Sequence, residues 1–254
     1  MAILSLDLAF RSWRDLGIVV MERGLETGSP VHCELVCWDE PGPVQAEMLA
    51  GRLNHLCGIR DIRIVMLDGP QAWKSVENES PHARLSERVL NAAAKMGLPG
   101  MVKPVTYRAF AEFCVDVYDA LRRRGWRRLA SRNRPRNSSE HVLVESYPYA
   151  AWKALGIRPL PAKRRARVCD LAEAFAALQA VVPLTVNQPP NHDQMQAIVG
   201  GLAGLALEAR NQVGARIVGS TPRREGGHWR EGFIVVPEPI RSSTPSWPNV
   251  RWLN

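Results

Sequence analysis

The chain opens with the apolar stretch Ala2-Ile3-Leu4-Ser5-Leu6-Asp7-Leu8-Ala9, which predicts a buried β-strand. One acid, Asp7, stands inside this stretch. A charged side chain in so apolar a segment is costly unless a cation or another partner meets it. Asp7 is therefore the first candidate for a functional residue, and the rest of the chain can be searched for side chains that would join it.

Three further acids stand where predicted elements end or begin. Asp68 follows the apolar run 62–67, and Glu145 follows the run 142–144. Asp193 comes at the start of a late helix that is rich in Ala and Gly. The carboxyl ends of strands form the edge at which open α/β sheets usually bind ligands. Four carboxylates that converge there from separate elements predict a site for a hard divalent cation, Mg²⁺ or Mn²⁺.

Each of the later acids also has a simpler interpretation. Asp68 precedes Gly69-Pro70 and can be a turn former. Glu145 can pair with a nearby arginine. Asp193 can cap its helix or act as a first-turn acid that the helix dipole favours. The joint arrangement of all four acids favours a functional site over these separate explanations.

The pattern of apolar residues predicts an alternation of strands and helices. The expected strands cover residues 2–9, 16–22, 31–38, 62–67, 142–144 and 232–236. The expected helices cover residues 45–56, 107–121, 149–155, 167–181 and 192–213, with one more that starts near Ser80 and stops at Gly97. Residues 182–190 are expected to form a linker. The short turn after the first strand predicts that the first two strands pair in antiparallel fashion.

A meander of three strands, then a helix, a strand, helices, a strand and a terminal helix is the element order of the RNase H-like architecture. We therefore expect an α/β fold with a mixed sheet, in which a three-strand antiparallel meander is joined by parallel strands and flanked by helices. Residues 1–238 are expected to form a single domain with a helical, basic insertion around residues 97–140. Residues 239–254 are expected to be a C-terminal tail.

The composition is that of a globular chain that folds without disulfide bonds or other cross-links. With 254 residues and 46% hydrophobic content, the chain can bury a substantial core. Its 5 cysteines form no CxxC pair and leave one over, which favours a reducing compartment over a disulfide framework. No apolar run approaches the length that crosses a bilayer. We expect a cytoplasmic protein without a membrane partner.

The formal net charge of +8 and the pI near 9.7 predict a polyanionic partner, nucleic acid of the DNA or RNA type. Basic residues gather in two segments, one before and one after the strand of Glu145. The candidates for phosphate binding are Lys74, Arg122, Arg123, Arg124, Lys163 and Arg164. Two other interpretations stay open, because the arginines can favour the carboxyl end of a helix or belong to a solvated loop. Trp126, which lies among them, is expected to pack in the core.

Several short motifs resemble the domain-of-unknown-function 429 family, which is described as predicted nucleases of RNase H fold. They are Asp68-Gly69-Pro70, Val144-Glu145-Ser146-Tyr147-Pro148, the basic region of Lys163, His192-Asp193 with the helix that follows, and Glu231-Gly232-Phe233-Ile234. The resemblance covers most of the chain, and the arginine-rich segment looks like a local elaboration. It implies an RNase H-like fold and nuclease activity.

One position departs from the family pattern. In that pattern a second aspartate follows His-Asp about one helical turn later, immediately before alanine. This chain has Gln196 there, before Ala197. An amide can donate or accept hydrogen bonds, but it is a poor substitute for a carboxylate as a ligand for a hard cation. If the missing acid is a metal ligand in the family, Asp193 is the residue that can supply its function here.

The leading hypothesis is a nuclease that hydrolyses phosphodiester bonds by a two-metal mechanism, with Asp7 bridging the ions and Asp68, Glu145 and Asp193 completing the set. A second hypothesis is a noncatalytic nucleic-acid-binding protein that keeps the fold but lost the chemistry with Gln196. A third is an actin-like ATPase or phosphotransferase. The third would require a Gly- and Thr-rich phosphate loop after the first strand, and the residues after Asp7 include no glycine up to Ser12.

Overall fold

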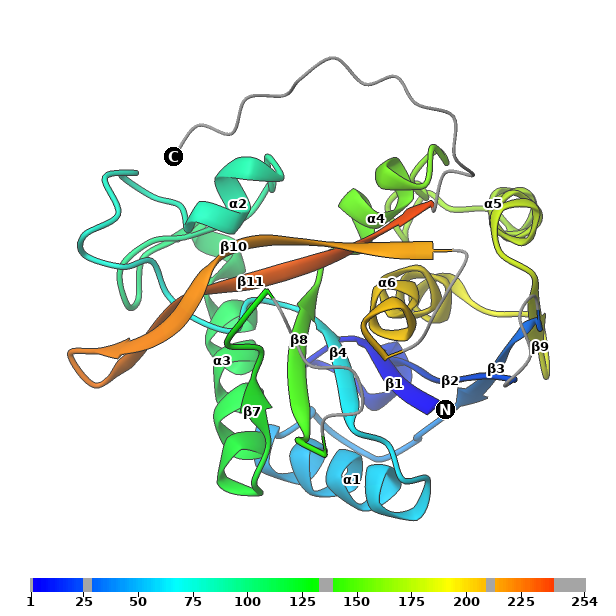
Figure 1. The fold of residues 1–254 in the computed structure, drawn as a ribbon, viewed down its shortest axis with the longest axis horizontal. Helices are drawn as coiled ribbons and strands as arrows, with labels where there is room; N and C mark the ends of the chain where they lie inside the picture. The colour runs from blue at the N-terminus through cyan, green and yellow to red at the C-terminus, as the bar shows by residue number, and fades with distance from the viewer. Residues whose placement is uncertain (1, 25–28, 133–138, 209–212, 240–254) are drawn as a thin grey trace.

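The structure is a computed structural model, and it describes residues 2–24, 29–132, 139–208 and 213–239 (Figure 1). The strands are β1 (Ala2–Asp7), β2 (Gly17–Arg23), β3 (Val31–Val36), β4 (Ile64–Asp68), β5 (Lys95–Met96), β6 (Val102–Lys103), β7 (Arg127–Arg128), β8 (Val142–Ser146), β9 (Leu184–Val186), β10 (Val213–Glu225) and β11 (His228–Pro239). The α-helices are α1 (Ala46–Ile59), α2 (Leu85–Val89), α3 (Arg108–Arg123), α4 (Pro148–Ala154), α5 (Val168–Val181) and α6 (His192–Glu208). Two short 3₁₀ turns are η1 (Trp13–Asp15) and η2 (Val105–Tyr107).

Nine of the strands in the described ranges form one mixed sheet, in the order β10-β11-β8-β4-β1-β2-β3-β9, with β7 pairing with β8 beside this path. Strands β1, β2 and β3 form an antiparallel meander. Strand β4 runs parallel to β1, and β8 runs parallel to β4. The predicted mixed α/β sheet, with a three-strand meander and added parallel strands, is therefore confirmed.

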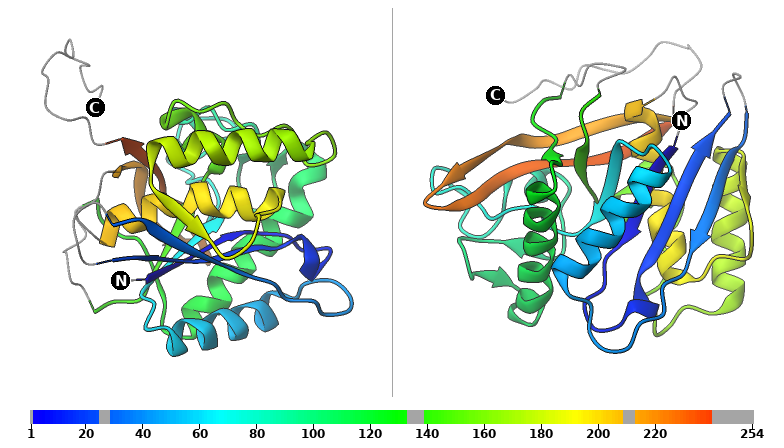
Figure 2. Two further views of the ribbon diagram at one scale, coloured as in Figure 1. Left: turned by 90° about the vertical axis from the view of Figure 1, so that its right-hand side faces the viewer. Right: turned by 90° about the horizontal axis from the view of Figure 1, so that it is seen from below.

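Helices cover both faces of the central strands (Figure 2). Helices α1 and α3 pack on one face, against Leu4 and Leu6 of β1. Helix α6 packs on the other face, against Ile3 of β1, and α4 and α5 lie on the same side. Because β1 is buried on both faces, its sequence is a continuous apolar run rather than an alternating one.

The glycines of α6 let the helix approach the sheet closely. A Cβ atom at Gly201 would lie 2.3 Å from Sδ of Met21, and one at Gly204 would lie 2.7 Å from Cγ of Met66. The hydroxyl of Ser5 donates to the carbonyl of Ala197 at 2.7 Å and ties the helix to β1. Helix α6 is thereby held in direct contact with the middle of the sheet.

The predictions for the second half of the chain were wrong at two places. The expected linker 182–190 contains β9, which pairs in parallel with β3 through contacts such as Val31 with Leu184. The last helix was expected to reach residue 213, but it is described only to Glu208, and Val213 begins β10. Both strands were missed because their partners lie far away in sequence or because, as in β10, polar residues interrupt the apolar pattern.

The helix expected between Ser80 and Gly97 is also shorter than predicted. Helix α2 has one turn and ends at Val89, and the side chains of Leu85 and Val89 are exposed rather than turned to the core. The buried residues of this turn are Ser86 and Glu87. The apolar spacing was misleading here because the segment is held by buried polar contacts.

The segment expected as an insertion, residues 97–140, supplies α3, which packs against α1, and β7, which extends the sheet. Trp126 is buried, as expected, and its indole donates to Asn54 at 3.0 Å. The expected tail 239–254 lies outside the described residues except for Pro239, the last residue of β11. In the part of the chain that the structure covers, no helix combines the length and the apolar character needed to span a bilayer.

Candidate metal centre

Asp7 and Asp68 lie side by side at the carboxyl ends of two adjacent parallel strands. Asp7 is in register with Asp68, and Asp68 is in register with Ser146 on β8. Residues in register point to the same face of a sheet, and side chains alternate along each strand. Since Ser5 bonds to α6, Asp7 and Asp68 also point to the α6 face. The two acids that the sequence singled out first are thus neighbours.

The surroundings of both carboxyl groups oppose their ionisation. Burial raises the pKa of Asp7 well above its ordinary value, and the charges of Asp68 and Asp193 raise it further, while Lys163 lowers it. Burial and then the charge of Glu145 raise the pKa of Asp68 to about 7, against a hydrogen bond with Asp7 that lowers it. A hydrogen bond between two carboxyl groups needs a shared proton. A positive charge placed next to the pair would therefore stabilise its ionised form.

Asp193 reaches the pair from the first turn of α6. The helix is capped by Asn191, whose side chain accepts from the backbone of Gln194 at 2.9 Å, so Asp193 is not the cap. The close approach of the helix to β2 depends on Gly17, where a Cβ would lie 2.1 Å from the carbonyl oxygen of Asp193. Gly17 is in register with Asp7. This contact places the start of α6 directly beside the end of β1.

Lys163 provides the nearest ammonium group to these acids. It forms an ion pair with Asp193 and a second one with Asp15, the latter at 2.7 Å. Burial lowers the pKa of Lys163, but the hydrogen bonds to Asp15 and Asp193 outweigh this effect and hold it above its ordinary value. The lysine stays protonated and balances part of the negative charge around Asp7.

Glu145 does not join the other acids, and its expected role as a metal ligand is not supported. It is in register with Leu67, one position before Asp68, so it points to the opposite face of the sheet. There the guanidinium of Arg84 binds it in a bidentate pair, with contacts of 2.7 and 2.6 Å. The backbone N–H of Gln71 donates to it at 3.0 Å. The simpler interpretation, an acid paired with an arginine, holds for Glu145.

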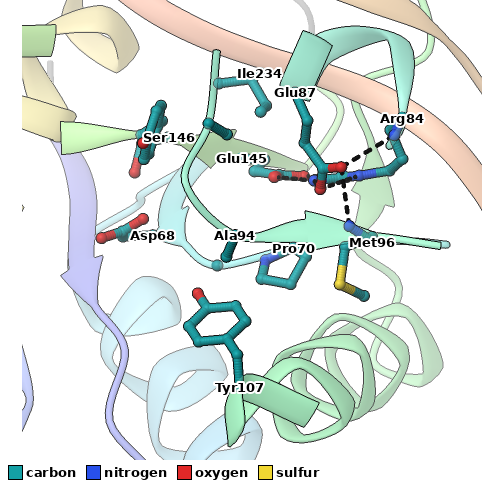
Figure 3. Close-up of a pocket in the computed structure, with 13 residues that line it drawn as sticks. Asp68, Pro70, Arg84, Glu87, Ala94, Met96, Tyr107, Glu145, Ser146 and Ile234 are labelled. Carbon is teal, nitrogen blue, oxygen red and sulfur yellow. Dashed lines mark hydrogen bonds and ion pairs between the residues drawn. The ribbon is translucent and has the colours of Figure 1, made fainter. Parts of the chain in front are cut away.

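Arg84 also binds Glu87, at 2.8 Å, and both side chains of this second pair are almost fully buried. The buried triad of one arginine and two glutamates forms one wall of a cavity of about 130 Å³ next to Asp68 (Figure 3). Tyr107 directs its hydroxyl into this cavity, and Ser146 lines it on the side of Asp68. The hydroxyl of Ser146 is buried without a hydrogen-bond partner in the described part of the chain.

Of the basic residues predicted to bind phosphate, the structure brings Lys163 to the acids, and its neighbour Arg164 is exposed on the same loop. Lys74 is buried and donates to the carbonyls of Ser75 and Asn78 at 2.8 and 2.6 Å. Its ammonium group is therefore engaged in holding a loop, and as placed it does not support the expected phosphate contact.

Arg122, Arg123 and Arg124 lie at the carboxyl end of α3, away from the acids. The chain that follows them pairs with the start of β8, whereas Asp68 is in register with its end. Arg123 and Arg124 form ion pairs with Glu47 of α1. The structure does not bring these three arginines to Asp7, and the interpretation of a helix end favoured by arginines fits the described contacts.

Gln196, at the position where the family pattern has an acid, accepts a hydrogen bond from the indole of Trp152 at 2.8 Å. Its amide oxygen is therefore engaged with α4. His192, which precedes Asp193, contacts the carbonyl of Pro161 through Nε2 at 2.9 Å. Both side chains hold α6 against its neighbours.

The residues present fit a divalent cation in chemistry, because Asp7, Asp68 and Asp193 offer oxygen ligands of the kind that Mg²⁺ and Mn²⁺ prefer. As the side chains are placed, however, no group of three or more His, Cys, Asp or Glu residues in the described ranges is positioned to hold a metal ion. The carboxyl pair with its raised pKa values is the feature that a cation would relieve.

Sequence reasoning missed three residues of this region. Arg84 falls within the helix expected between Ser80 and Gly97 and was given no role, because nothing in its local sequence marks it as the partner of Glu145. Asp15 was read as a turn residue, and its contact with Lys163 spans 148 positions. Tyr107 was expected on the predicted helix 107–121 without a role. Covariation between distant positions in an alignment of homologues is the signal that could have identified these three residues.

No protein-family model matches the chain, and no curated protein matches it. Among solved structures, that of RuvC from Thermus thermophilus aligns over 82% of this chain and 96% of its own, with 13% sequence identity and a TM-score of 0.39. The resemblance to the domain-of-unknown-function 429 family therefore stays a prediction.

Proposed function

We propose that the protein is a divalent-metal-dependent hydrolase of phosphodiester bonds in nucleic acid, with Asp7, Asp68 and Asp193 as its metal ligands. The observation that carries the proposal is the in-register pair Asp7 and Asp68 at the carboxyl edge of the sheet, with Asp193 brought beside them by the contact of α6 with Gly17. The strand order, with an antiparallel meander and two added parallel strands, is the order expected of an RNase H-like fold.

The residues have distinct roles in this proposal. Asp7 is central, because Asp68 and Asp193 both act on it electrostatically. Lys163 forms an ion pair with Asp193 and remains half-exposed, and we assign it the contact with a phosphate oxygen. Divalent cations, when bound, supply activation of a water molecule and stabilisation of the leaving oxygen. Glu145 supports the site through Arg84 and is not part of the ligand set.

The second candidate is a nucleic-acid-binding protein without cleavage activity. Two observations favour this second candidate. Gln196 is engaged with Trp152, and the charge of Asp193 is already balanced by Lys163. Such a protein would keep the basic surface and the fold but would bind no catalytic metal.

The proposal is tested by incubating labelled single-stranded, duplex, hybrid and branched DNA and RNA with the protein and Mg²⁺, Mn²⁺ or EDTA. We expect cleavage that depends on the metal and is lost in Asp7→Asn, since the amide removes the central carboxylate. The loss should be at least about a hundredfold, given the share of the reaction barrier that metal ions supply.

The matched control is Asp61→Asn. Asp61 is exposed and has a positive φ of 47°, a conformation that asparagine tolerates well, so the variant makes the same chemical change away from the site. It should cleave like the wild type. Binding without cleavage by the wild type under every metal condition would favour the second candidate, and equal activity of Asp7→Asn and the wild type would refute the assignment of the site.

A further inference from the structure

A second feature of the molecule, separate from the acids, is a groove of about 440 Å³ on the flank of the sheet. It lies between the carboxyl end of α3, β7 and the hairpin of β10 and β11, which Figure 1 shows on the same side of the molecule. Its principal lining residues are Arg122, Trp126, Arg127, Arg128, Pro222 and Trp229. We refer to it below as the arginine groove.

Positive charge in the arginine groove exceeds the negative charge that the described residues place around it. Arg122 and Arg127 are exposed on its rim, and Arg128 is buried in its wall. Arg128 pairs with Asp119 at 2.9 Å, and Arg127 makes a long, exposed contact of 3.4 Å with Glu140. Burial lowers the pKa of Arg128 and the charge of Arg122 lowers it further, although Asp119 opposes both. An anion in the groove would relieve this repulsion.

The wall of the groove also contains hydrogen-bond donors that lack acceptors. Nη1 of Arg128 and Nε1 of Trp229 are both buried without a partner in the ranges that the structure describes. The guanidinium of Arg128 stacks on the indole of Trp229, at 4.6 Å from the ring centroid. Both donor atoms are buried, so a ligand in the groove meets the exposed guanidinium groups of Arg122 and Arg127, and the stacked side chains of Arg128 and Trp229 form the wall beside it.

The position of the groove relative to the acids follows from strand register. Arg127 is in register with Val142, at the start of β8, whereas Asp68 is in register with Ser146, at its end. A strand rises about 3.3 Å per residue, so these two points on β8 are roughly 13 Å apart. A ligand that touches both sites must be a polymer of several units rather than a single nucleotide.

We propose that the arginine groove binds the phosphodiester backbone of a nucleic acid at a site distinct from the acids. Arginines beside an indole suit this ligand, because guanidinium groups bind phosphate oxygens in bidentate fashion and carry no requirement for a base sequence. The inference deepens the proposed function by giving the polymer a second point of attachment. It does not depend on cleavage.

The test measures binding in EDTA, so that cleavage plays no part. A labelled 30-base-pair DNA duplex and its single strand are titrated with the full chain over a series of salt concentrations. The rim variant Arg122→Ala/Arg127→Ala spares the buried Arg128 and should fold normally. Each phosphate contact contributes a slope of about 0.9 for duplex or about 0.7 for single strands in log K against log salt. We expect the double variant to lower the slope by about 1.4–1.8 and to weaken binding roughly tenfold.

The matched control is Arg167→Ala/Arg216→Ala, which removes the same charge from two arginines outside the groove, paired with Asp170 and Glu238. It should leave the salt slope close to that of the wild type. An unchanged slope in the rim variant, an equal drop in the control, or absence of binding by the wild type would each overturn the proposal. If the wild type binds through the groove but never cleaves, the result supports nucleic-acid binding by the groove and contradicts the proposed hydrolase activity.

Discussion

Asp7 and Asp68 show how two acidic side chains acquire a joint meaning once they are neighbours. Asp68 precedes Gly-Pro and can be explained as a turn former, whereas Asp7 stands out as a charge within an apolar strand. Their register makes them neighbours, and among the charges around Asp7 that of Asp68 raises its pKa most. A pair of this kind binds either a proton or a cation, and the pH and the metal concentration decide which.

The stability of the metal-free protein should fall as pH rises from about 4 to about 7. The folded-state pKa of Asp68 is raised to about 7 from an ordinary value of 3.8, so folding favours the protonated acid. That contribution is complete below the ordinary pKa and is lost as pH passes the folded-state pKa, by about 1.4 kcal/mol per pKa unit. Asp68→Asn removes the ionisable group. Urea unfolding in EDTA at several pH values measures the free energy of unfolding. Relative to the wild type, that of Asp68→Asn should rise by a few kcal/mol as the pH increases to 7.

Above pH 7 the difference between Asp68→Asn and the wild type should level off, because both the folded and the unfolded chain then carry the ionised acid. Asp61→Asn serves as the control again, because it makes the same chemical change at an exposed position away from the pair. A constant difference for Asp68→Asn across the whole range would show that the acid is not desolvated as the structure places it.

Glu145→Gln should destabilise the protein rather than act on chemistry alone. The substitution leaves the buried guanidinium of Arg84 without half of its charge partners, and breaking a buried pair costs about 3–5 kcal/mol. Asp7→Asn, by contrast, removes a repulsive charge and should leave the metal-free protein at least as stable as the wild type. Denaturant midpoints measured side by side separate the two roles. Full stability of Glu145→Gln with loss of cleavage would return Glu145 to the metal ligands.

At this scale the sequence predicts which residues are unusual but not which way they point. Asp7 and Asp68 could be predicted because each ends an apolar strand. Glu145 ends one as well, yet it stands one position earlier in the register and faces the other side. A shift of one residue reverses the face of a strand, and a run as short as 142–144 does not specify the register from sequence alone.

At the scale of elements, the packing of α6 on the sheet decides whether Asp193 reaches the acids. Gly201 lies within contact of Ser5 and Met21, and Gly17 meets the backbone of Asp193 itself. These glycines lower helix propensity or strand propensity, so their value lies in the close approach that they permit. The position of the Asp193 carboxylate therefore depends on the absence of a side chain at Gly201 of the same helix and at Gly17 of β2.

Gly201→Ala should cost about 1–3 kcal/mol, because its Cβ would lie 2.3 Å from Sδ of Met21 and the helix would have to move. Gly58→Ala is the matched change in α1, where nothing lies within 4 Å of the added Cβ. That variant should gain up to about 1 kcal/mol from helix propensity. Thermal unfolding of both variants tests the close approach, and equal effects of the two changes would contradict it.

Helices and strands were predicted well where the apolar pattern within the segment itself identifies them. The opening meander, the strand of Asp68 and the helices α1, α3 and α5 follow from apolar spacing within the segment. Strand β9 could not be predicted in this way, because three residues become a strand only by pairing with β3. Strand β10 contains Arg216, Arg223 and Arg224, and its polar pattern reflects a position with one neighbour in the sheet.

At the scale of the whole molecule, binding of a divalent cation should appear as a gain in stability. A ligand that binds only the folded state adds about 2.7 kcal/mol at a hundred times its dissociation constant. Thermal unfolding at pH 8 should therefore shift upward with Mg²⁺ or Mn²⁺ in the wild type. The shift should vanish in Asp7→Asn and persist in Asp61→Asn. A shift of equal size in all three proteins would mean that the cation binds elsewhere.

The two ends of the sheet bear on how copies of this chain behave together. An open strand edge offers unpaired backbone groups to which another chain can add. Here one end is β9, only three residues long, and the other is β10, which carries Pro222, several arginines and an irregular register between Ser220 and Arg223. Short length, proline, charge and a bulge are the devices that discourage strand addition. These features discourage a second copy of the chain from adding a strand at β9 or at β10.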